Sequence, residues 1–130
     1  GTGEGLCGWN CRHSFYPFFP GVSRRLYDEA ALARLAAKTV EYGGKLYTEY
    51  EITQMQRALE RRVRKAKRQF LAEDAAGVDT TRASARLRDV RRALNDFVSA
   101  TGGKLSAART DAAGFGAAQA RRTNRDAKSI

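Results

Sequence analysis

Apolar residues recur at helical spacing in two long stretches of the chain, and these stretches define the expected fold. The first stretch covers residues 50 to about 73, with an apolar stripe of Ile52, Met55, Leu59, Val63, Ala66 and Phe70. The second runs from a cap at Asp79 or Thr80 to about residue 100, with a stripe of Ala83, Leu87, Val90, Leu94, Phe97 and Val98. A period of 3.6 residues places each set on one helix face. Since the connection is short and neither stripe is stable in water alone, we expect an antiparallel helical hairpin that is closed by a glycine cap in Thr101-Gly102-Gly103.

Two shorter elements are expected before this helical hairpin. Residues 26–38 favour a helix with Ser23 as its N-cap and an apolar stripe of Leu32, Leu35 and Ala36. In residues 39–48, two runs with β-branched and aromatic side chains flank a Gly-Gly pair, which tolerates the positive φ of a two-residue hairpin turn. An isolated β-hairpin is marginally stable in water, so this one must pack on another part of the chain. The aromatic segment near the N-terminus is the expected partner.

That aromatic segment is the most unusual part of the sequence: Cys11-Arg12-His13-Ser14-Phe15-Tyr16-Pro17-Phe18-Phe19-Pro20-Gly21. The prolines exclude a regular helix, and the large rings must be buried or matched to a partner. We therefore interpret residues 1–24 as an irregular structural loop that fixes the fold or anchors a neighbour. Arg12 would organise it by forked hydrogen bonds or by stacking, and His13 would be a packed ring. The structural residues are Trp9, Cys11, Arg12, His13, Phe15, Tyr16, Phe18 and Phe19.

The end of the chain has a different composition. Leu105, Phe115 and Ile130 are the only large apolar residues after residue 103, and Gly114-Phe115-Gly116 interrupts any helix. Residues 104–130 are therefore expected to form a basic, weakly ordered tail that orders on contact. The expected fold is mostly α, an antiparallel helical hairpin with an additional short helix, a small β-hairpin and an aromatic irregular N-terminal loop. Its segments are the loop (1–24), the helix, β-hairpin and helical hairpin (25–103), and the tail.

The chain is strongly basic, with 24 Lys and Arg against 14 Asp and Glu and a net charge of +10. Such a balance favours a polyanionic partner. No apolar run is long enough for a transmembrane helix, so we expect no membrane span. Basic side chains flank both apolar stripes, where they could neutralise phosphates independently of base sequence. The alternative is a solvated surface of local charge pairs. The candidates for binding nucleic acid or a partner are Arg57, Arg61, Arg64, Lys65, Arg68, Arg82, Arg86, Arg88 and Arg92.

Few residues suggest chemistry. Cys7, Cys11 and His13 could supply three zinc ligands, but no other His is available as a fourth. Two free thiols in a tight loop, or a disulfide, are the alternatives. No phosphate-binding glycine loop, Ser/His/Asp triad or shielded carboxylate pair is identified. We therefore predict no catalytic residues and, apart from the zinc alternative, no cofactor.

Three blocks of sequence resemble one family in order. Asn10-Cys11-Arg12-His13-Ser14-Phe15-Tyr16-Pro17-Phe18-Phe19-Pro20-Gly21 resembles the loop of the phage minor capsid proteins, the head-morphogenesis proteins of tailed phages. Thr39-Val40-Glu41-Tyr42-Gly43-Gly44, with Tyr50-Glu51-Ile52-Thr53-Gln54-Met55-Gln56-Arg57-Ala58-Leu59-Glu60-Arg61, resembles the block that follows there. Ala113-Gly114-Phe115-Gly116 is similar to the family's ending.

This resemblance implies a structural protein of a virion or prophage that supports head assembly or DNA packaging. The implied partners are portal or capsid proteins, with duplex DNA bound by charge, and the oligomeric state stays open. The implied location is the capsid interior or portal vicinity, after a stage in the host cytoplasm. Because the sequence starts with a glycine-rich stretch and no Met, we expect it to be the C-terminal portion of a longer protein.

Two other functions are considered. One is a nucleic-acid-modifying effector, a nuclease or deaminase, with a metal site at Cys7, Cys11 and His13. The other is a host regulator that binds DNA through the helical hairpin, which would need a set of base-reading side chains on one helix that the sequence does not show.

Overall fold

The computed structural model describes residues 15–128. The chain divides into two compact units, the first ending at Leu32 and the second spanning Ala33–Ile130, and each is described by itself. The loop residues Trp9, Cys11, Arg12 and His13, together with Cys7, lie outside the described residues. Their predicted roles therefore stay predictions.

The described part of the first unit is a turn followed by the start of a helix. The backbone amides of Val22 and Ser23 donate to the carbonyl of Phe19 at 3.1 and 2.8 Å, and the Ser23 hydroxyl accepts from the Phe19 amide at 3.0 Å. Helix α1 (Glu29–Ala36) begins later, where Asp28 Oδ1 accepts from the Ala31 amide at 2.7 Å. The predicted N-cap Ser23 is therefore wrong, because its hydroxyl closes the preceding turn.

Helix α1 is also shorter than the predicted range 26–38, and its apolar stripe is not buried. Leu32 and Leu35 are more than half exposed, and no residue of α1 is buried. The sequence pattern thus identified the helix but not the exposure of its leucines.

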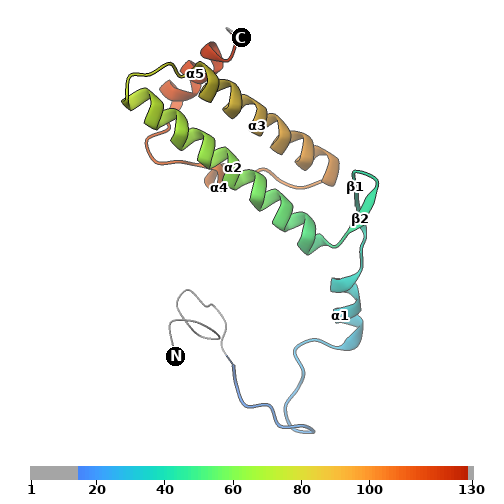
Figure 1. Ribbon diagram of the computed structural model, residues 1–130. Coiled ribbons are helices and arrows are strands. Elements are labelled where there is room, and N and C mark those ends of the chain that lie inside the picture. Colours follow the sequence, from blue (N-terminus) through green and yellow to red (C-terminus); the bar gives the residue numbers. More distant parts are fainter. Residues whose placement is uncertain (1–14, 129–130) are drawn as a thin grey trace. The chain divides into compact units, whose positions relative to one another are not determined.

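Two long helices form the centre of the second unit. Helices α2 (Glu49–Ala75) and α3 (Thr81–Thr101) lie side by side and antiparallel, as predicted (Figure 1). Gly102, in the left-handed region at φ +67°, ends α3 as expected. Thr80 occupies the N-cap position of α3 without a side-chain cap bond, because its buried hydroxyl donates to Asp126. Asp79 Oδ1, one residue earlier, accepts from the Thr81 amide at 3.0 Å.

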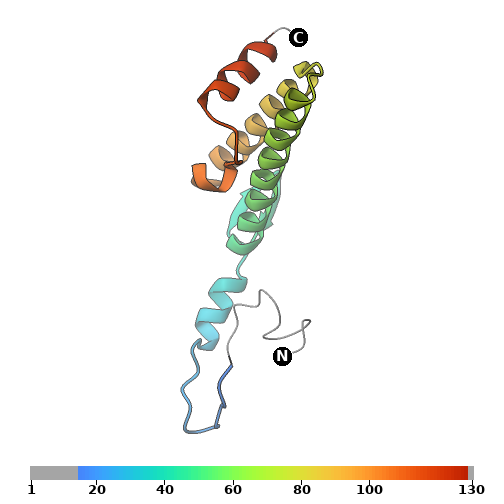
Figure 2. The same ribbon diagram turned by 90° about the vertical axis from the view of Figure 1, so that its left-hand side faces the viewer.

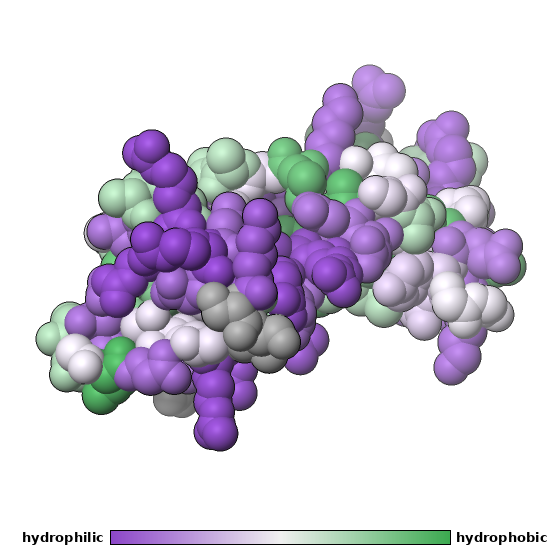
Figure 3. Space-filling model, turned by 90° about the horizontal axis from the view of Figure 1, so that it is seen from above, coloured by the Kyte–Doolittle hydropathy of each residue, from purple (hydrophilic) through white to green (hydrophobic). Residues whose placement is uncertain are grey.

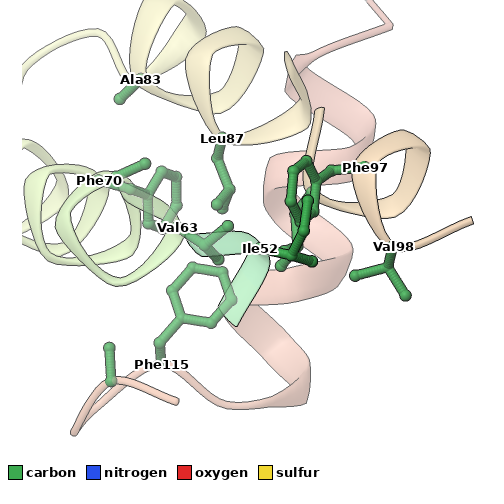
Figure 4. Close-up of a cluster of buried hydrophobic side chains, with 11 residues drawn as sticks. Ile52, Val63, Phe70, Ala83, Leu87, Phe97, Val98 and Phe115 are labelled. Carbon is green, nitrogen blue, oxygen red and sulfur yellow. The ribbon is translucent and has the colours of Figure 1, made fainter. Parts of the chain in front are cut away.

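The predicted apolar stripes meet between these helices. Side chains of α2 and α3 converge there, and Phe70, Leu87 and Val63 are at most 1% exposed (Figure 4). Met55, Leu59 and Val90, at the edges of the stripes, are partly buried. The core of the described residues is thus the seam of the helical hairpin.

The predicted β-hairpin is confirmed. Strands β1 (Val40–Tyr42) and β2 (Lys45–Tyr47) pair antiparallel, and Gly43 and Gly44 occupy the turn with φ of +58° and +75°. The Tyr42 ring packs edge-on against Phe97 of α3, with 4.8 Å between the centroids. The partner of this hairpin is therefore the end of α3, a contact that the sequence did not indicate.

The C-terminal segment differs most from expectation. Residues 104–130, predicted to be a weakly ordered tail, contain α4 (Ala107–Thr110) and α5 (Ala117–Asp126). Phe115, 9% exposed, packs edge-on against Phe70, and Thr123 of α5 is 2% exposed. Both helices lie on the same side of the α2–α3 pair (Figure 2). Because the inward residues of α5 are small, its backbone approaches α3 without a large apolar stripe.

Candidate nucleic-acid and partner interface

Four of the predicted basic residues form one ridge on α2. Arg57, Arg61, Lys65 and Arg68 follow one another at intervals of three or four residues, and all four are exposed. This spacing places them on one helix face, opposite the buried stripe. Like charges at this spacing destabilise a helix by about 0.2–0.5 kcal/mol per pair. A polyanion bound along the ridge would offset this repulsion.

Carboxylates do not neutralise this ridge. Among the described residues, Arg88 is the only one of the nine candidates in a salt bridge, with 3.3 Å between its Nε and Asp89 Oδ1. Glu60 is surrounded by bases in sequence, but it is 2% exposed and its carboxylate accepts from Gln56 Nε2 at 2.9 Å. The alternative of a surface of local charge pairs does not describe the ridge.

Two further candidates, Arg82 and Arg86, belong to a different face. With Arg62 they border a shallow pocket of about 470 Å³ whose lining comes from α2 and α3 alone. Leu59 and Val90 supply apolar surface there. Arg86 Nη1 donates to Gln69 Oε1 at 3.0 Å, which holds its guanidinium across the two helices.

Arg64 and Arg88 have structural roles instead. Arg64 Nη1 donates to the carbonyl of Arg109, and Arg88 Nη1 to the carbonyl of Ala127, both at 2.6 Å. These bonds tie the C-terminal segment to α2 and α3. Arg92 is exposed on α3. The nine candidates therefore fall into three groups and one single residue. Four form the ridge, two lie on the second basic face, two hold the C-terminal segment, and Arg92 belongs to none of these groups.

Hydrophilic side chains dominate the face of the molecule that Figure 3 shows. In the aromatic segment, Phe15, Tyr16, Phe18 and Phe19 are each more than half exposed.

No helix in the described part of the chain has the length and apolar character of a membrane span.

The sequence did not single out two basic residues that line a recess. Lys67 is 9% exposed, with its Nζ 5.1 Å from the centroid of the Phe115 ring. The Arg91 guanidinium carbon lies 5.6 Å from the same centroid. Burial lowers the pKa of Lys67, and the charge of Arg91 lowers that pKa further. The sequence feature that could have indicated the burial of Lys67 is its position, because it directly follows Ala66 at the margin of the apolar stripe.

Residues 15–128 contain no group of His, Cys, Asp and Glu side chains suited to a metal ion. The zinc prediction for Cys7, Cys11 and His13 concerns residues outside the described range. It therefore stays a prediction.

The fold and surface define a small helical protein that displays basic side chains on several faces. The chain belongs to the family described as Phage minor capsid protein 2, whose model matches residues 1–99. The resemblance of the aromatic and β-hairpin blocks to phage minor capsid proteins is thus confirmed. The matched residues end before α4 and α5, so the similarity of Ala113-Gly114-Phe115-Gly116 to the family's ending stays a prediction.

A curated relative supports this assignment. The chain is similar to a structural protein of Lactococcus phage mv4, with 38% identity over 80 residues. The match covers 59% of this chain and 54% of the relative, so it spans about half of the relative's length. No solved structure matches the chain.

Proposed function

We propose that this chain is a virion protein that works by contact in the phage head, where its neighbours are capsid or portal proteins and packaged DNA. The family match and the relative's description as a structural protein support the virion location. The more specific role, support of head assembly or DNA packaging, rests on the basic surface. No step of this role requires a catalytic residue.

The observation that carries the DNA contact is the unpaired ridge of Arg57, Arg61, Lys65 and Arg68. At a rise of 1.5 Å per residue, the ridge extends for roughly 16 Å along α2. Duplex DNA carries one charge per about 1.7 Å of its axis, so several phosphates face a ridge of this length. The ridge contains no aromatic residue for base stacking, which favours contact with the duplex backbone over single-strand recognition.

The test is the salt dependence of binding to a duplex of random sequence, measured by fluorescence anisotropy. The double variant Arg61→Gln/Arg68→Gln removes two phosphate contacts. The negative slope of log K against log salt concentration should therefore become shallower by about 1.8. Arg24→Gln/Arg25→Gln is the matched control, because it removes the same net charge from exposed positions outside the ridge.

Equal weakening by both double variants would show that net charge alone attracts DNA, and the assignment to the ridge would fail. Binding that is absent at low salt, or that does not weaken with salt, would refute the DNA contact. The ridge would then be assigned to an acidic capsid or portal surface.

A further inference from the structure

A pocket of about 420 Å³ lies where α2 and α3 meet the segment that leads into α4. Val63 and Leu94 supply apolar wall, and residues 105–107 and Thr110 form the side contributed by the C-terminal segment. This pocket shares no lining residue with the pocket that Arg62, Arg82 and Arg86 border. Its position is also separate from the exposed ridge, because α4 packs on this part of α2.

Two cations line the pocket without an anionic partner. Lys67 is more than nine-tenths buried and Arg91 is half-buried. Within the described residues neither side chain forms a salt bridge, and no hydrogen bond to either is found. Both lie against the Phe115 ring, whose electron-rich face offsets only part of the cost of burying charge. The Asp111 carboxylate, which favours the charged form of Lys67, instead accepts from the Ala112 amide at 2.8 Å.

Neutral donors complete the wall. Asn95 and Ser106 line the pocket beside the two cations and can donate an amide and a hydroxyl hydrogen. The Thr110 hydroxyl already donates to backbone carbonyls of its own turn, so it contributes no free donor. Two cations with two neutral donors match the charge and the multiple acceptor oxygens of a phosphate group better than those of a single carboxylate.

We infer that this pocket binds a phosphate group, with Lys67 and Arg91 as its cationic ligands and Asn95 and Ser106 as neutral donors. Because Lys67 is buried, the internal phosphodiester groups of a regular duplex cannot reach it in this pocket. Free inorganic phosphate and the terminal phosphate of a nucleotide share the required chemistry. The inference does not depend on the DNA contact of the ridge. Burial and the Arg91 charge both lower the pKa of Lys67, and a bound anion acts against both effects.

The primary experiment is a titration of the full chain with inorganic phosphate at constant ionic strength, followed by calorimetry and by thermal unfolding. We expect saturable binding and a midpoint temperature that rises at low millimolar phosphate but not in matched chloride. Constant ionic strength and low concentration are needed because phosphate at high concentration stabilises proteins without binding a site.

Lys67→Met keeps the length of the side chain and removes its charge, so we expect phosphate binding to weaken by at least about tenfold, as for the loss of a charge-assisted bond. Lys45→Met, at an exposed position of β2 outside both the pocket and the ridge, is the control and should bind phosphate as the unsubstituted chain does. Arg91→Gln with the control Arg92→Gln repeats the comparison on α3. It keeps the test decisive if Lys67→Met does not fold.

Comparison of thymidine monophosphate with inorganic phosphate separates the two sources, with thymidine as the control that lacks a phosphate. Tighter binding of the monophosphate than of inorganic phosphate identifies a nucleotide terminus, and equal or weaker binding identifies free phosphate. Either result supports the site. The inference is overturned if phosphate does not bind, if acetate binds equally well, or if the position 67 and 91 variants match their controls. The variants at positions 67 and 91 keep all four ridge residues, so duplex binding by the ridge is tested independently and the two proposals fail separately.

Discussion

At the scale of single residues, the start of α2 shows how a local hydrogen-bond pair fixes a helix end. The Thr48 hydroxyl accepts from the Glu51 amide at 3.1 Å, and the Glu51 carboxylate accepts from the Thr48 amide at 2.7 Å. This capping box satisfies two backbone donors that the first turn leaves without partners. It also explains why α2 begins at Glu49, just before the predicted start.

The capping box predicts a specific pH dependence. The hydrogen bonds from Thr48 lower the pKa of Glu51 below its usual 4.5. The ionised carboxylate therefore stabilises the folded chain above about pH 4.5, and this contribution is lost as the pH falls through the lower folded-state pKa. Glu51→Gln keeps an acceptor oxygen but does not titrate. We expect it to be less stable than the unsubstituted chain at pH 7, with a difference that shrinks below pH 4.5.

Urea unfolding from pH 7 to 3 measures this difference. Glu49→Gln, at an exposed position in the same turn, is the control and should keep the pH dependence of the unsubstituted chain. A Glu51→Gln curve parallel to that of the unsubstituted chain throughout this range would contradict the argument.

Single residues also mark the limit of sequence-based prediction. Glu60 and Lys67 are charged residues of the kind that usually lie at the surface, yet both are buried. Burial of Glu60 depends on Gln56, whose Nε2 donates both to Glu60 and to the carbonyl of Lys104 at 2.9 Å. That carbonyl belongs to a segment 48 residues away, and no local pattern reveals such a partner.

At the scale of elements, large apolar side chains separate what was predictable from what was not. Helices α2 and α3 follow from stripes of Leu, Val and Phe, and the β-hairpin from its Gly-Gly turn. Helix α5 buries Thr123 and places Ala120 near the core, and its attachment uses Arg122 paired with Asp74. Small or charged residues of this kind indicate a surface in the sequence. Phe115 was the informative residue of the segment, and its isolation made it resemble a tail residue.

Removal of the Phe115 ring should therefore release the C-terminal segment. Phe115→Ala eliminates the contact with Phe70 and the surface on which Lys67 and Arg91 lie. We expect a loss of about 3 kcal/mol in the free energy of unfolding, the lower end for a buried Phe, because the ring lies at the edge of the core. Hydrogen exchange should accelerate in α4 and α5 and stay slow at the centre of α2 and α3.

Leu105→Ala is the matched control, since Leu105 is a large apolar residue of the same segment and is 56% exposed. It should change the stability by less than about 0.5 kcal/mol. If Phe115→Ala behaved like this control, α5 would not depend on the ring.

At the scale of the whole molecule, apolar burial and aromatic exposure occur in different parts of the chain. The buried hydrophobic residues of the described range all lie between Ile52 and Ala127. The aromatic residues of the first unit, from Phe15 to Tyr27, are each more than half exposed. A cluster of exposed rings at this density is typical of a surface that contacts a partner. The sequence left open whether the aromatic segment fixes the fold or anchors a neighbour, and the distribution of burial favours the anchor.

Truncation distinguishes these two roles. Residues 33–130 contain every buried hydrophobic residue of the described range. If the aromatic segment is an anchor, they should unfold with a midpoint within about 2 °C of the full chain, well under the 4–8 °C that about 1 kcal/mol produces in a domain of this size. Differential scanning calorimetry of both chains at equal salt gives this comparison. A fall of more than about 4 °C would show that the segment contributes to stability and would assign it to the fold.

Substituting Phe18 and Phe19 by Ser in the full chain supplies an independent check, because exposed rings that serve only a partner can be removed without loss of stability. Unchanged stability in both experiments would leave contact with a neighbour as the role of the rings.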